Sequence, residues 1–148
     1  MINDSIKITG DVKIDIIGAD GVVKDSREIK NLVVTTGKNY IASRMKDATA
    51  TAMTHMELGT GTTAAAVGDT TLQTAIASSR VTLTSTTVTT NAIAYVASFP
   101  AGTGTGAVTE AGTFNAASAG TMLCRTVFSV VNKGANDAMS ITWTITVS

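Results

Sequence analysis

Two glycine-rich stretches are the first residues whose spacing suggests chemistry, because glycine-rich loops can wrap around a phosphate. They are Gly-Thr-Gly at 59–61 and Ala-Gly-Thr-Gly-Thr-Gly at 101–106. The first lacks the third glycine of a dinucleotide fingerprint. A P-loop ends in a lysine, and the sequence has none between Lys46 and Lys133. We therefore expect both stretches to be turns between strands.

His55 is the only histidine and Cys124 the only cysteine, so each is a candidate for catalysis or metal binding. Glu57 would share a strand face with His55, but an isolated His–Glu alternation is usually structural. A metal site needs additional His or Cys ligands, and a cysteine within a strand usually behaves as a small apolar residue. We expect no catalytic site, no cofactor and no metal, so the sequence does not predict an enzyme.

Charge is distributed unevenly along the 148 residues, although eleven basic and eleven acidic side chains give a formal net charge of zero. Eight of the basic and seven of the acidic residues lie in the first 47, and the remainder is rich in Thr, Ala, Gly and Ser. Zero net charge gives no electrostatic footprint for nucleic acid or an anionic membrane. A surface poor in Lys and Glu is easily desolvated against another protein. A Thr-rich β surface without a partner is the alternative.

Glu110, Arg80 and Arg125 are among the few charged residues after residue 47. We expect Glu110 to pair with one of the two arginines, either on one sheet or across a subunit boundary. A solvated pair that contributes little is the alternative.

The first 34 residues predict a β-hairpin, with turn residues at 18–21 and a second strand from Val22 onward. The alternating apolar positions of the first strand are Ile6, Ile8, Val12, Ile14 and Ile16. We expect residues 1–34 to form a hairpin arm that can reach a neighbouring molecule, and residues 35–148 to form the main domain. The two parts together make one compact domain.

A short amphipathic helix is expected near 36–47. Thr35 or Thr36 can serve as its N-cap, and Ile41 and Met45 lie four residues apart on one face. We interpret this helix as a cover for one face of a sheet.

The rest of the chain predicts short strands, of which 93–99 and 139–147 alternate most regularly. Tyr95 and Trp143 fall on the apolar sides of these strands, so we expect both to be buried. A turn at 133–137 predicts a hairpin between 127–131 and 139–147. Eight or so strands predict a mainly β protein, an antiparallel β-sandwich of jelly-roll or Greek-key type.

Residues 1–5 are polar and start no apolar segment typical of a signal peptide. No run of about 18 apolar residues predicts a membrane span. We therefore expect a soluble protein that is made in the cytoplasm and has no membrane partner.

Seven segments have a shared character: HMELGTGTTAA (55–65), GDTTL (68–72), RVTL (80–83), AVTEAGTFN (107–115), GTMLCRTVF (120–128), ITWTITV (141–147) and, upstream, NLVVTTGKN (31–39). As a series they resemble segments of small virion structural proteins of tailed bacteriophages. The resemblance runs from about residue 22 to the end and includes no catalytic signature.

Proteins of this kind are similar to capsid cement or decoration proteins and to small tail-fibre or collar components. The first resemblance implies a homotrimer on the capsid exterior that binds the major capsid protein and clamps the shell against internal DNA pressure. The second implies attachment to a host receptor, with a saccharide as the expected ligand. The short chain and the expected burial of Tyr95 and Trp143 favour the capsid role.

Overall fold

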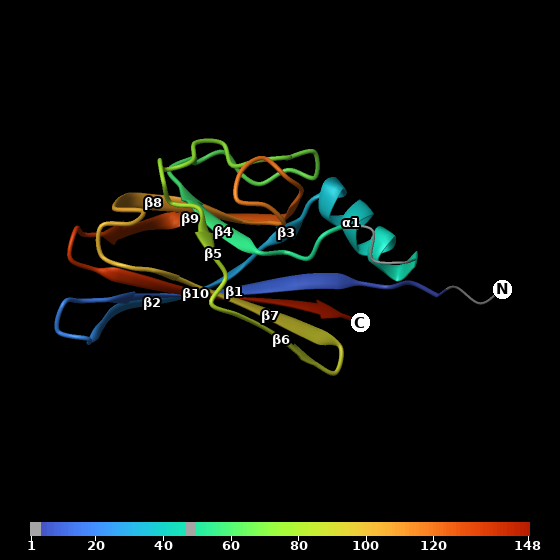
Figure 1. Cartoon of the computed structure of the whole chain (residues 1–148), viewed down its shortest axis with the longest axis horizontal. Coiled ribbons are helices and arrows are strands. Elements are labelled where there is room, and N and C mark those ends of the chain that lie inside the picture. The colour runs from blue at the N-terminus through green and yellow to red at the C-terminus, as the bar shows by residue number, and fades with distance from the viewer. Residues whose placement is uncertain (1–3, 47–49) are drawn as a thin grey trace.

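Two five-stranded antiparallel sheets lie in layers, and a single described helix lies at one end of them (Figure 1). This computed structural model describes residues 4–46 and 50–148. The first sheet has the order β2-β1-β10-β7-β6 and the second β3-β9-β8-β4-β5. The first sheet contains β1 (Ile8–Ile17), β2 (Val23–Lys30), β6 (Ser85–Thr89), β7 (Ala92–Phe99) and β10 (Ala138–Val147). The second contains β3 (Leu32–Val33), β4 (His55–Gly59), β5 (Val81–Thr82), β8 (Gly106–Phe114) and β9 (Met122–Lys133). The expected mainly β sandwich with one short helix is confirmed.

The N-terminal hairpin of β1 and β2 is part of the first sheet. β1 lies between β2 and β10, and its register with β10 runs without interruption from Ile8↔Val147 to Ile17↔Ala138. The hairpin expected within residues 1–34 is therefore present and is incorporated in the first sheet, while its reach to a neighbouring molecule stays a prediction; residues 1–3 lie outside the described chain. The physical reason for this incorporation is that the alternating apolar side chains Val12, Ile14 and Ile16 all lie on one face of β1, and packing between the two sheets buries them.

The core is built from rows of side chains that cross three strands of the first sheet. Val12, Trp143 and Tyr95 are cross-strand neighbours and are all buried, as the alternation of their strands predicted. Ile14, Ile141 and Ala97 form a second row, and Ile16, Met139 and Phe99 a third. Aligned apolar pairs of this kind are the main stabilising unit of a sheet.

β9 and β10 do not form the predicted hairpin. β9 pairs with β3 and β8 in the second sheet, whereas β10 lies between β1 and β7 in the first. The turn near Gly134 therefore carries the chain from one sheet to the other, and the Asp137 N–H bonds to the Gly134 carbonyl at 3.1 Å. Both strands have one apolar side that faces the shared core, so alternation alone could not distinguish a hairpin from a crossover between sheets.

The helix α1 (Thr35–Lys46) differs in detail from the expectation, and residue 47 lies outside the described chain. Its hydrogen bonding starts at Val34, whose carbonyl accepts the Lys38 N–H at 3.0 Å, so neither threonine is the N-cap. The buried residues are Gly37 and Tyr40, whereas Met45 is 77% exposed. A Cβ at Gly37 would lie 2.0 Å from the Leu123 carbonyl oxygen, so glycine lets the helix lie directly on β9.

Candidate functional site

Glu110 is the centre of a buried polar cluster beneath the glycine-rich stretch at 59–61. It lies on β8 opposite Gly59, the last residue of β4, and is 0% exposed. Its carboxylate accepts backbone N–H groups from Gly61 at 3.0 Å, Gln73 at 3.0 Å and Thr74 at 2.7 Å. The glycine-rich loop thus surrounds an anion, and that anion is a carboxylate of the same chain.

Gly61 is glycine because the loop approaches Glu110 very closely. A Cβ at this position would lie 2.5 Å from the Oε1 of Glu110 and 2.6 Å from the Cβ of Gln73. Since real Cβ atoms do not tolerate such distances, any other residue would move the loop away from the carboxylate. The glycine therefore serves the internal hydrogen bonds, and the expectation of a simple turn missed this contact.

Arg125 provides the positive charge of the cluster. Its Nε donates to the Oε2 of Glu110 at 2.9 Å, its Nη2 lies 2.8 Å from the same oxygen in an ion pair, and its Nη1 donates to the Oδ2 of Asp69 at 2.8 Å. Nη2 also donates to the Thr63 carbonyl at 3.1 Å. One guanidinium therefore ties β8 and two points of the loop together. The arginine that pairs with Glu110 is Arg125, within one chain and on one sheet.

The pKa of Glu110 reflects a competition between burial and hydrogen bonding. Burial alone would raise the pKa, but the N–H groups of Thr74 and Gln73 together with the Arg125 guanidinium lower it below the ordinary value. The pKa of Asp69 is lowered in the same way, because the Ala66 N–H and Arg125 outweigh its desolvation. Both groups are therefore ionised at neutral pH, and this favours a structural role over proton transfer.

Arg80, the other candidate partner of Glu110, binds a different carboxylate. Its Nη2 and Nε donate to the Oε2 of Glu57 at 2.8 and 3.2 Å, and its guanidinium lies 3.7 Å from the centre of the Phe114 ring. Its Nη1 donates to the carbonyls of Ala116 and Ala119 at 3.2 and 2.9 Å. Arg80 therefore connects β4 to the loop between β8 and β9.

Neither His55 nor Cys124 lies in an arrangement suited to catalysis. The Nδ1 of His55 lies 2.8 Å from the Thr54 hydroxyl, and the nearby Glu57 is bonded to Arg80. Cys124 is fully buried, and burial raises the pKa of its thiol to about 12, so it is a poor nucleophile. Among the residues that the structure describes, no three His, Cys, Asp or Glu side chains are grouped to hold a metal ion.

Lys133 is a buried charged residue that the sequence reasoning did not identify. It is 1% exposed, and its Nζ donates to the carbonyls of Pro100 at 2.9 Å and Asp137 at 2.7 Å. Burial lowers the pKa of this lysine. The signal was present in the sequence, because Lys133 has the same strand parity as the buried Val131. Its ammonium group fixes the crossover between β9 and β10.

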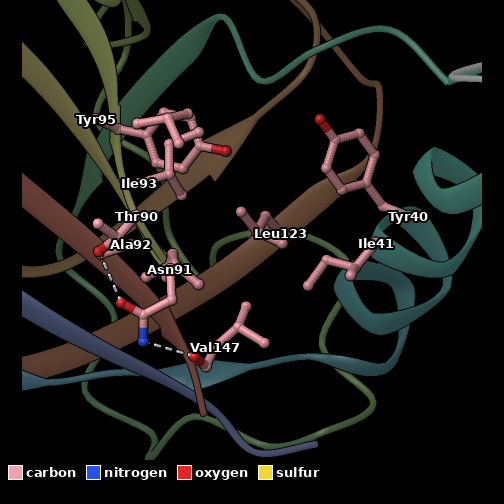
Figure 2. A pocket seen from close by; sticks show the side chains of 11 residues that line it. Tyr40, Ile41, Thr90, Asn91, Ala92, Ile93, Tyr95, Leu123 and Val147 are labelled. Atoms are coloured by element: carbon pink, nitrogen blue, oxygen red, sulfur yellow. Dashed lines mark hydrogen bonds between the residues drawn. The ribbon is translucent and has the colours of Figure 1, made fainter.

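An apolar cleft of about 410 Å³ opens between α1 and the ends of β7 and β10 (Figure 2). Its apolar lining includes Tyr40, Ile41, Val88, Ile93, Ile145 and Val147. At its rim Asn91 Nδ2 donates to the Val147 carbonyl at 2.8 Å, and the Thr90 hydroxyl donates to Asn91 Oδ1 at 3.1 Å. These rim groups are bonded to each other, so the cleft offers mainly apolar contact. Sequence patterns alone did not locate it, because its walls come from distant segments.

Comparison with family models, with curated proteins and with solved structures finds no match to this chain. No described helix is long and apolar enough to cross a membrane. The arguments below therefore rest on the chain's own residues and on the phage-protein resemblance of its segments.

Proposed function

We propose that this chain is a non-enzymatic virion structural protein that binds the outer surface of a phage capsid and stabilises the shell. The partner in this proposal is the major capsid protein. The chain also associates with itself, as the homotrimer that the resemblance implies. It needs no cofactor, nucleic acid or membrane for this role.

One observation carries the proposal: every charged side chain after residue 47 is bonded within the molecule. The seven residues are Glu57, Asp69, Arg80, Glu110, Arg125, Lys133 and Asp137. The two arginines bind three carboxylates, Lys133 binds two carbonyls, and Asp137 accepts from Lys24 at 2.8 Å. The surface of residues 50–148 therefore consists mainly of hydroxyl, amide and apolar groups, and a charge that does reach it, such as Asp69 with a 25% exposed side chain, is already paired.

A surface of this kind costs little to desolvate, because no strongly hydrated charge must be stripped of water or find a partner on the other side. It is suited to broad contact with proteins rather than to a small charged ligand. The closed ion pairs also argue for rigidity, since they hold the loop at 60–74 against the second sheet. A clamp that resists outward pressure needs such a rigid body.

The alternative, a tail-fibre or collar component that binds a host saccharide, has less support. Sugar-binding sites use exposed aromatic rings, and the three Trp and Tyr side chains are all less than 10% exposed: Trp143 0%, Tyr95 5% and Tyr40 9%. The surface that we propose for capsid binding is broad, and within the described chain no exposed Trp or Tyr ring is present on it for a sugar to stack against.

The copy number in purified particles tests the proposal. A shell-binding protein is expected in hundreds of copies, because its sites repeat with the capsid lattice. A count of about a dozen would instead indicate a tail or collar position.

A second measurement tests shell binding directly. The purified chain is mixed with capsids that lack it, and the particles are sedimented and then heated. Saturable co-sedimentation and a higher temperature of DNA release are the expected results. Binding to isolated tails and not to shells would overturn the proposal.

A further inference from the structure

β6 is the edge strand of the first sheet, and its outer side has no neighbouring strand within the described chain. All five of its residues, Ser85–Thr89, are exposed. An edge strand presents a row of free N–H and C=O groups to any further strand, and proteins usually protect such edges with charges, proline or a bulge. β6 has no charged residue and no proline, and its register with β7 is uninterrupted. It is an unprotected edge.

The opposite edge of the same sheet, β2, is protected. Its eight residues include five charged ones: Lys24, Asp25, Arg27, Glu28 and Lys30. Its pairing with β1 also shifts register near Ile17. The missing protection is therefore specific to β6 and is not a general property of this sheet.

The inner side of β6 is apolar and uncovered as well. Thr86 is opposite Tyr95 and Val88 is opposite Ile93, so these two β6 side chains lie on the core-facing side of the sheet. Val88 is nevertheless 70% exposed, and it lines the cleft beside α1. Figure 2 shows the neighbouring walls of this cleft, with Ile93 on the sheet and Ile41 on the helix. A strand added to β6 would extend the inner face and cover Val88.

We propose that this strand is β6 of a second copy of the chain, paired antiparallel about a twofold axis. In such an isologous contact each charge near the axis meets its own copy, so a charged edge repels itself. The entire hairpin 84–99 carries no charged residue and avoids this repulsion.

The register of the pairing follows from the alternation of the strand together with the pairing of all five of its residues. Centred on Thr87, it places Thr87 opposite its own copy and Thr86 opposite Val88 of the second copy. Paired residues then lie on the same face, and the inner faces of the two sheets continue each other. A shift by one residue would turn one inner face to the opposite side. The paired residues are β-branched, which favours strand pairing.

The contact is small, since five residues on each side bury far less than the 1,200–2,000 Å² of a stable interface. We expect a reversible association with a dissociation constant on the order of 0.1 mM in solution. It is separate from the proposed threefold association and does not depend on the capsid role. As the protein concentration rises above this constant, the mass of the species that is present at low concentration should double.

Sedimentation equilibrium across a concentration series tests this inference with a matched pair of variants. Val88→Lys puts a charge on β6, and Val23→Lys puts the same charge on β2, where Val23 is 51% exposed. We expect mass doubling in the unmodified chain and in V23K, and a weakening of at least about tenfold in V88K. Absence of doubling up to about 1 mM, or equal weakening in both variants, overturns the proposal.

Cysteine cross-linking tests the register. Paired Cα atoms in an antiparallel ladder lie about 4.5–5.5 Å apart, within the range of a disulfide. Thr87→Cys should therefore form covalent dimers on mild oxidation about tenfold faster than Val23→Cys. The native Cys124 is fully buried and gives little background. Equal rates for the two variants would contradict pairing about Thr87.

Discussion

The N-terminal hairpin and the second sheet use charged residues in opposite ways. In β1 and β2 the ion pairs lie at the surface: the side chains of Lys30 and Asp11, which contact each other, are 83% and 53% exposed. In the second sheet the side chains of Arg125 and Glu110 are 3% and 0% exposed. Both regions pair their charges, but the pair in the hairpin is solvated and the pair in the second sheet is buried.

The difference indicates what each set of charges does. Exposed pairs contribute little to stability, yet they keep β2 hydrated and discourage strand addition at that edge. Buried pairs cost desolvation, and in return they fix the loop at 60–74 against the second sheet. The same residue types therefore have two roles: exposed ion pairs protect the edge of a sheet, and buried ion pairs hold a loop in place. The following predictions test this distinction.

The largest effect is expected from Glu110→Gln. The amide cannot accept all the bonds that the carboxylate accepts, and Arg125 loses one of its two counter-charges inside the protein. Removing one partner of a buried pair costs about 3–5 kcal/mol; since Asp69 remains, we expect about 3 kcal/mol. Urea unfolding followed by circular dichroism measures this. A loss below about 1 kcal/mol would show that the cluster behaves like a surface pair.

Acidification is expected to destabilise the protein through the same cluster. The pKa values of Glu110 and Asp69 are lowered in the folded chain, so the folded state binds fewer protons than the unfolded state when these groups titrate. Their contribution is complete above the unfolded pKa of about 4 and is lost as pH falls through the folded pKa values. Thermal unfolding between neutral pH and about pH 3 should show this loss. E110Q should show a shallower dependence, and an identical dependence in both proteins would contradict the assignment.

Much of the fold could be predicted from the sequence because alternation reports directly on a half-buried strand. The apolar parity of β10 correctly predicted that Trp143 is buried, and the parity of β7 did the same for Tyr95. Alternation does not say which strands are neighbours, and this is why the β9–β10 hairpin was wrong. The same limit applied to β1, whose position inside the sheet depends on pairing with the last strand of the chain.

The site was predictable only in part. The scarcity of charge after residue 47 marked Glu110 and Arg125 as a pair, but nothing in the spacing chose Arg125 over Arg80. That choice depends on the register between β8 and β9. Arg125 is opposite Gly112, which lies two residues from Glu110 along β8, so Arg125 is a diagonal neighbour of Glu110. The participation of Asp69 and of loop N–H groups depends on the path of an irregular segment, which no periodicity describes.

A smaller effect is expected from Gly61→Ala, which pushes the loop away from Glu110. The new Cβ would meet the carboxylate oxygen at 2.5 Å, so loop and side chain must both shift. We expect a loss of about 1–3 kcal/mol. Gly68→Ala in the same loop is the matched control, because its Cβ would meet nothing within 4 Å. Its stability should stay within about 0.5 kcal/mol of the original. Equal losses would show that the loop needs glycine for flexibility and not for contact.

The smallest effect is expected from Asp11→Asn, which removes the exposed partner of Lys30. Water already solvates both side chains, so the free energy of unfolding should change by about 0–1 kcal/mol, and added salt should reduce the change further. Urea unfolding at low and high salt measures both values. A loss as large as that of E110Q would remove the distinction between the two regions, because charge would then matter equally at the surface and in the interior.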